Sequence, residues 1–207
     1  MADLLVKICG MTRPEDVVGC TQAGADLLGF IFAAKSPRRV TIEQAAALPR
    51  TRAKRVGVFV EQPLDEVLAI MEAAELDFAQ LHAGQTPDFC RAVGAQRVIR
   101  AFWPQRHPDM AALAAEVARF AGTIGYALLD AGTSGGGHGL SLPFAPLADF
   151  SPPMPWLLAG GLGPDNVAEA LAQARPHGLD LNSGVESSPG LKELAKVRRS
   201  LWAVKGE

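Results

Sequence analysis

The sequence predicts an α/β protein, a (β/α)8 barrel of the TIM type, as a single domain over residues 1–207. One observation is a unit that recurs eight times: a short apolar run, turn residues, then a stretch rich in Ala, Leu and Glu. Continuous apolar runs bounded by turns are typical of buried parallel strands, and their alternation with helices indicates βαβ units. A second observation is the length, 207 residues, which suits a small barrel of this kind. A doubly wound open sheet is the alternative, but it usually has fewer strands and a marked switch point.

The apolar runs give the expected strands, and the intervals between them give the expected helices. The strands are expected at residues 4–10, 27–32, 55–60, 78–82, 97–103, 126–131, 156–161 and 178–184. The helices are expected at residues 13–25, 41–48, 62–75, 86–93, 107–120, 163–174 and 190–204, with a weak one at 142–150.

Several expected helices begin with recognisable start signals. Thr12 precedes Pro14 and two acidic residues, which favours a cap by Thr12 and a helix start at the proline. The same logic applies to Pro108 with Asp109, and to Pro164 in the segment before the seventh helix. These signals support the boundaries between strands and helices.

Composition and charge exclude several classes of function. The chain is 48% hydrophobic and 20% charged, with a formal net charge of -2 and no long block of one sign. This charge distribution does not indicate a basic surface that would bind nucleic acid or an anionic membrane. No apolar run approaches the roughly 18 residues of a membrane helix, and the first residues do not resemble a secretory leader. The chain has three cysteines, an odd number with no CxxC pair, which indicates a reducing compartment. A cytoplasmic location is therefore expected.

Active sites of such barrels lie at the C-terminal ends of the strands, so polar residues there are the candidates. Side chains two apart share a strand face, which pairs Lys7 with Cys9 on the first strand and Gln80 with His82 on the fourth. Asp180 and Asn182 pair in the same way on the eighth strand. Polar groups that converge inside a barrel are costly unless they are satisfied or used.

Cys9 ends the first strand, just before Gly10 and a helix start. A free cysteine most often behaves as a small buried hydrophobe. This position could instead expose the sulfur and lower its pKa, and Lys7 could help to keep a thiolate charged. Cys20 and Cys90 fall inside expected helices and are interpreted as structural.

Asp130 ends an otherwise apolar sixth strand and precedes a glycine-rich loop. A carboxyl group in such a place tends to have a raised pKa, so it can stay protonated and serve as a general acid. The alternative is an aspartate that caps the next loop, because Asp is common in turns. The loop at residues 132–139 is expected to be mobile and to cover the site.

Two glycine-rich segments follow the seventh and eighth strands, where barrels frequently bind phosphate. Gly160 and Gly161 in the first, with Ser183 and Gly184 in the second, are the candidate phosphate contacts. Glycines let backbone N–H groups approach an anion, although ordinary turn geometry would also explain them. A small-molecule substrate with a terminal phosphate is therefore expected.

Arg38 and Arg39 follow the second strand and could bind a carboxylate or phosphate through the guanidinium fork. For Arg39 a solvated surface position is favoured. Among four histidines only His82 ends a strand, whereas a catalytic metal usually needs about three convergent protein ligands. No metal site is therefore expected, and His82 is taken as a substrate contact.

Together these motifs resemble the phosphoribosylanthranilate isomerase family of tryptophan biosynthesis. The similarity runs in order along essentially the whole chain, and its most specific parts are KICGMT from Lys7 and SGVE from Ser183. The sequence departs from the family after Asp130, where Pro143 and Phe144 replace a usual Asp-Trp pair.

The resemblance implies a (β/α)8 barrel and a cofactor-free Amadori rearrangement of N-(5'-phosphoribosyl)anthranilate to the corresponding 1-deoxyribulose 5-phosphate. It implies Cys9 as general base, Asp130 as general acid and Arg38 as the contact to the anthranilate group. Because the family contains both monomers and homodimers, either state is open. Two alternatives also stay open: another sugar-phosphate isomerase or epimerase on the same barrel, and a phosphate-ligand-binding barrel without catalysis.

Overall fold

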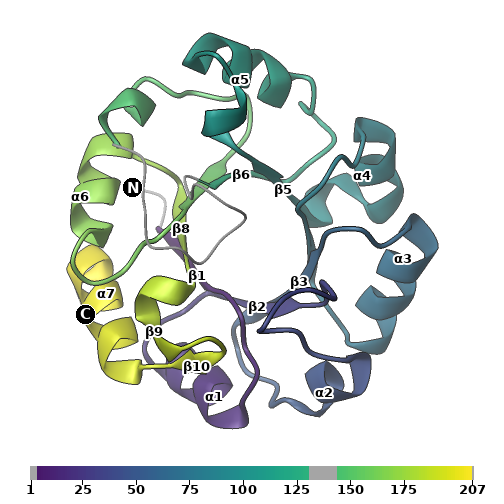
Figure 1. Ribbon diagram of the computed structural model, residues 1–207, viewed down its shortest axis with the longest axis vertical. Helices are drawn as coiled ribbons and strands as arrows, with labels where there is room; N and C mark the ends of the chain where they lie inside the picture. The colour runs from purple at the N-terminus through teal and green to yellow at the C-terminus, as the bar shows by residue number, and fades with distance from the viewer. Residues whose placement is uncertain (1–3, 131–143, 207) are drawn as a thin grey trace.

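The computed structural model describes residues 4–130 and 144–206, and in them eight parallel strands close into a barrel (Figure 1). Each strand pairs with its neighbour in sequence, and the eighth pairs with the first. The predicted barrel is confirmed. The strands are β1 (Leu5–Ile8), β2 (Leu27–Ile31), β3 (Lys54–Phe59), β4 (Phe78–Leu81), β5 (Val98–Phe102), β6 (Tyr126–Asp130), β7 (Trp156–Ala159) and β8 (Gly178–Leu181).

Helices form a ring outside the strands (Figure 1). None in the described parts of the chain is long and apolar enough to cross a membrane. After β6 the weak predicted helix is a single 3₁₀ turn, η3 (Ala145–Leu147). The α-helices are α1 (Pro14–Gln22), α2 (Ile42–Ala47), α3 (Leu64–Ala73), α4 (Pro87–Val93), α5 (Met110–Ala118), α6 (Val167–Ala174) and α7 (Leu194–Lys205).

The period-two pattern of the strands separates two apolar layers. Outward residues such as Ile8 and Leu129 belong to the large core between barrel and helices. Inward residues such as Val56, Ile99 and Leu128 form a second core inside the barrel. Close packing of this inner core fills the lower barrel, so only the C-terminal ends of the strands are left to form a site.

The helix starts follow the predictions in part. The start of α1 at Pro14 is confirmed. The predicted start at Pro108 was wrong: α5 begins after Asp109, whose carboxylate caps it by accepting a hydrogen bond from the Ala112 N–H at 2.8 Å. The prediction for Thr12 was wrong: the N-cap of α1 is Arg13, without a side-chain cap. The Thr12 hydroxyl instead donates to the Gly190 carbonyl at 2.6 Å, since a distant segment folds over it.

That distant segment is a small antiparallel hairpin that the sequence patterns did not indicate. After β8 and a short 3₁₀ turn, β9 (Glu186–Ser188) pairs with β10 (Leu191–Lys192), and the pair lies beside α1 (Figure 1). The last helix therefore begins at Leu194 and not near Gly190. The Lys192 N–H donates to the buried Asp16 carboxylate of α1 at 3.2 Å, which fixes the hairpin across the N-terminal loop.

Candidate active site

A cavity of about 510 Å³ opens at the C-terminal ends of the strands. Most of the predicted site residues meet there, although they come from six different strand ends or loops. Lys7 and Gly184 are not among its lining residues. The predicted residues that line it are Cys9, Arg38, His82, Asp130, Gly160, Gly161 and Ser183.

Cys9 stands at the end of β1 with its side chain on the inner face, as the alternation predicts. It packs with Ile31 and Val58 and is only 4% exposed. Burial raises the pKa of the Cys9 thiol, and the nearby Lys7 ammonium opposes this rise only in part. Of the two possibilities that the sequence left open, the structure therefore favours the buried thiol, because the apolar wall beside Cys9 penalises the thiolate.

Lys7 lies one layer below Cys9 and is completely buried. Its ammonium donates to both carboxylate oxygens of Asp180 at 2.8 Å, and β1 and β8 place these residues directly opposite each other. Burial lowers the pKa of Lys7, but the Asp180 carboxylate and Cys9 outweigh it, so the net pKa is raised. Lys7 is therefore an ammonium ion held beneath the thiol of Cys9.

His82 follows β4 and is neutral. Burial first, then the charges of Lys7, Arg100 and Arg106, lower its pKa to about 3. The Nε2 atom of Gln80 lies 2.6 Å from the Nε2 atom of His82. The two side chains therefore share a hydrogen bond, and a neutral imidazole carries one N–H donor and one acceptor nitrogen.

Asp130 closes β6 opposite Ala159 of β7 and is 4% exposed. The register of β6 puts it on the same inward face as Leu128, so its carboxyl group reaches the cavity. The loop predicted at residues 132–139 lies outside the described residues.

The loop after β7 is shaped by glycines at positive φ, +108° at Gly160 and +67° at Gly161. Asn166 holds this loop, because its side chain accepts from the Gly163 N–H and donates to the Gly161 carbonyl. Gly184 is close-packed: a Cβ there would lie 2.2 Å from the Leu162 carbonyl oxygen. Gly184 therefore lets the loops after β7 and β8 touch, without lining the cavity itself.

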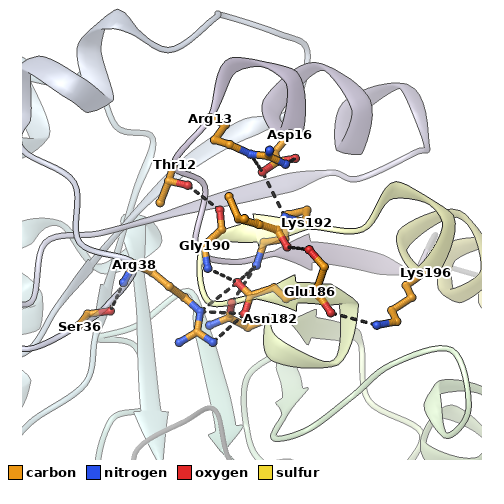
Figure 2. Close-up of polar contacts among 12 residues, drawn as sticks. Thr12, Arg13, Asp16, Ser36, Arg38, Asn182, Glu186, Gly190, Lys192 and Lys196 are labelled. Atoms are coloured by element: carbon orange, nitrogen blue, oxygen red, sulfur yellow. Dashed lines mark hydrogen bonds and ion pairs between the residues drawn. The ribbon is translucent and has the colours of Figure 1, made fainter.

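Arg38 reaches the cavity rim, whereas Arg39 is exposed, as predicted. The Arg38 guanidinium is paired with Glu186 of β9, and Glu186 in turn meets Lys192 of β10 (Figure 2). Lys192 also donates to the Asn182 side chain at 2.9 Å. A buried polar cluster thus stands behind the cavity wall.

Asp180, Asn182, Glu186 and Lys192 were absent from the predicted site. The pairing of Asp180 and Asn182 on one strand face was a usable signal, since both proved to line the cavity. No local pattern marks Glu186 or Lys192, because their partners are remote in sequence. No group of three His, Cys, Asp or Glu side chains suited to a metal occurs in residues 4–130 and 144–206.

The comparisons with known proteins agree on one family. The family model for N-(5'-phosphoribosyl)anthranilate isomerase matches residues 6–202. The enzyme of that name from Maridesulfovibrio salexigens is 50% identical over 201 residues, covering 97% of this chain and 98% of its own. The one from Desulfovibrio desulfuricans is 48% identical over 198 residues, covering 96% and 94%.

Solved structures give the same answer. The phosphoribosylanthranilate isomerase of Thermus thermophilus superimposes with a TM-score of 0.85 at 39% identity, covering 98% of this chain and 99% of its own. A phosphoribosylanthranilate isomerase in complex with reduced 1-(o-carboxyphenylamino)-1-deoxyribulose 5-phosphate superimposes with a TM-score of 0.83 at 29% identity, covering 99% and 100%. The chain belongs to the N-(5'-phosphoribosyl)anthranilate isomerase family.

Proposed function

We propose that this chain isomerises N-(5'-phosphoribosyl)anthranilate to 1-(2-carboxyphenylamino)-1-deoxyribulose 5-phosphate in tryptophan biosynthesis. The observation that carries the proposal is the convergence of a thiol from β1 and a carboxyl group from β6 on one cavity. Family membership supplies the substrate.

Asp130 is proposed as the general acid. It protonates the ring oxygen of the ribose, the bond from C1 to that oxygen breaks, and a protonated Schiff base remains. Cys9 then removes the proton from C2 as a thiolate, and the electron pair of that C–H bond neutralises the iminium nitrogen. The resulting enolamine tautomerises to the ketone, and each proton transfer contributes roughly 10²–10⁴-fold.

The raised pKa of Cys9 has two consequences for this step. A thiolate whose conjugate acid is weaker takes a carbon-bound proton more readily, but a smaller fraction of the thiol is ionised at neutral pH. The Lys7 ammonium beneath it partly restores that fraction, while Asp180 prevents Lys7 from acting as a full counter-ion. Lys7 is thus proposed to tune the base and not to contact the substrate.

The two ends of the substrate are proposed to be held on opposite sides of the cavity. The backbone at Gly160 and Gly161, together with Ser183, would receive the phosphate, since exposed N–H groups bind anions. Arg38 would receive the anthranilate carboxylate, because guanidinium binds carboxylates as a fork. His82, a neutral imidazole at the cavity wall, would hydrogen-bond to the substrate. Holding both ends fixes the reacting carbons between acid and base.

The test is the fluorescence decay of phosphoribosylanthranilate with the wild-type chain, Cys9→Ala and Asp130→Asn, in the presence of a chelator. We expect fast decay with the wild type and a loss of at least about 10²-fold in each variant. Cys20→Ala is the matched control, since Cys20 is equally buried but lies in α1, away from the cavity. No decay with the wild type would refute the reaction, and normal turnover by Cys9→Ala would refute the base.

The same experiment separates the alternatives. Decay that occurs without the chelator but not with it would indicate metal-dependent sugar-phosphate chemistry, and a barrel that only binds a phosphate ligand would show binding without decay. A cytoplasmic, single-domain enzyme, monomeric or homodimeric, remains the accompanying proposal. Monomers generated from a dimeric phosphoribosylanthranilate isomerase of Thermotoga maritima support keeping both states in this proposal.

A further inference from the structure

The Arg38 side chain uses only one of its two hydrogen-bonding edges within the described chain. Its Nε donates to Glu186 at 2.9 and 3.1 Å, and its Nη2 donates to the same carboxylate at 2.7 Å. A guanidinium has a second edge, Nη1 with Nη2, which can receive another carboxylate. Because Arg38 lines the cavity, that second edge is the one left for a ligand.

Glu186 is held more firmly than a simple ion pair would require. In addition to Arg38, it accepts from the Lys192 ammonium at 2.7 Å and from the Gly190 N–H at 3.0 Å (Figure 2). Glu186 is 7% exposed; burial would raise its pKa, but the hydrogen bonds from Arg38 and Lys192 lower it overall. The carboxylate is therefore ionised and fixed in direction.

The cluster is also assembled with little free space. Gly10 passes so close that a Cβ there would lie 2.8 Å from Cδ of Arg38 and 2.9 Å from Oδ1 of Asn182. Its φ of +79° is one that other residues rarely adopt. The glycine that follows Cys9 thus lets the Arg38 side chain lie flat against the N-terminal loop.

The charges of the cluster also favour a ligand with a carboxylate. Arg38 and Lys192 are two cations around one anion, Glu186, so the cluster holds a formal charge of +1 behind the cavity wall. A single carboxylate from the substrate would neutralise it. Because the excess positive charge is balanced only when a ligand binds, the cluster favours a ligand that carries one negative charge.

We propose that Glu186 is a positioning residue: it fixes one edge of the Arg38 guanidinium so that the other edge meets the carboxylate of the substrate. This rests on the proposed function, in which Arg38 receives the anthranilate carboxylate. Glu186 itself does not touch the substrate. Its effect must therefore pass through Arg38 and must concern only ligands that carry a carboxylate.

The experiment compares wild type, Glu186→Gln, Arg38→Ala and the double variant. It measures KM and kcat for phosphoribosylanthranilate, and inhibition by two ligands. Reduced 1-(o-carboxyphenylamino)-1-deoxyribulose 5-phosphate carries the carboxylate, and ribulose 5-phosphate lacks it. We expect Glu186→Gln to weaken binding of the carboxylate-bearing ligand and to raise KM, each by about tenfold or more. Binding of ribulose 5-phosphate should change little, and kcat should change less than KM. In the Arg38→Ala background the same substitution should add nothing.

The sign of the effect is itself informative. Glu186→Gln raises the formal charge of the cluster, so a purely electrostatic role predicts tighter binding of the carboxylate ligand. Tighter binding, equal weakening of both ligands, or an added effect without Arg38 would each overturn the positioning role. Asp16→Asn is the control for the hairpin, because it loosens the Lys192 backbone contact without touching Arg38. It should lower stability without discriminating between the ligands.

Glu186→Asp provides a second route if Glu186→Gln does not fold, since it keeps the negative charge but shortens the reach to Arg38. Unchanged discrimination in Glu186→Asp would likewise overturn the proposal. The outcomes also separate it from the proposed function. No turnover by the wild type would refute the function, whereas an effect of Arg38→Ala without one of Glu186→Gln would refute the positioning role alone.

Discussion

Removing one charge of the buried pair between Lys7 and Asp180 should be among the most destabilising changes in the barrel. The side chains are 0% and 7% exposed, and the ammonium contacts both carboxylate oxygens at 2.8 Å. Replacing Asp180 by Leu or Lys7 by Met leaves the partner as an uncompensated buried charge, which costs about 3–5 kcal/mol. For a chain of 207 residues this lowers Tm by roughly 6–20 °C.

The double variant Lys7→Met/Asp180→Leu should be more stable than either single variant, because it removes both charges together. A buried ion pair replaced by apolar side chains is often neutral or stabilising. The coupling between the two substitutions should then be at least about 3 kcal/mol, far above the roughly 0.5 kcal/mol of independent sites.

The assay is urea unfolding of the four proteins, followed by circular dichroism and analysed by linear extrapolation. Activity does not enter this comparison, so the loss of a residue below Cys9 does not obscure it. Single variants that cost less than about 1 kcal/mol, as exposed ion pairs do, would refute the assigned burial. A double variant as unstable as the sum of the two singles would refute the coupling.

Two further predictions concern the backbone at Gly10 and the buried thiols. Gly10→Ala should lower the free energy of unfolding more than Gly122→Ala. Both glycines have a similar positive φ, which costs alanine about 1–2 kcal/mol at either position. Only at Gly10 would the new Cβ also clash, because it would lie 2.8 Å from Cδ of Arg38. Equal losses in urea unfolding would contradict the close packing of the Arg38 cluster. Burial raises the pKa of Cys20 to about 12 and of Cys90 to about 11. Because the folded state holds these protons more tightly than the unfolded state, the thiols contribute to stability. The contribution is complete below the unfolded pKa of about 8.5 and is lost as the pH rises toward the folded values. Between about pH 9 and about pH 11, each thiol should lower the free energy of unfolding by up to about 1.4 kcal/mol per pH unit. The variant Cys20→Ala/Cys90→Ala should flatten this dependence of stability on pH. An unchanged dependence would contradict the raised pKa values of the two thiols.

The sequence by itself determined the barrel and the directions of its side chains. Short apolar runs alternating with helices specify parallel strands, and the period of two specifies which residues look inward. The pattern therefore assigns Cys9 and Asp130 to one cavity, together with Gly160 and Gly161, and all four line it. These are local properties of the chain, set by its covalent geometry and by burial.

Only the tertiary structure decided how the polar groups pair. Arg38 and Glu186 are 148 residues apart, and Lys7 and Asp180 are 173 apart, so their contacts depend on closure of the barrel between β8 and β1. The sequence left the pKa of Cys9 open for the same reason, since desolvation depends on neighbours that other strands supply. Local pattern fixes where a side chain points, whereas long-range packing fixes which charge it meets there and how much water remains.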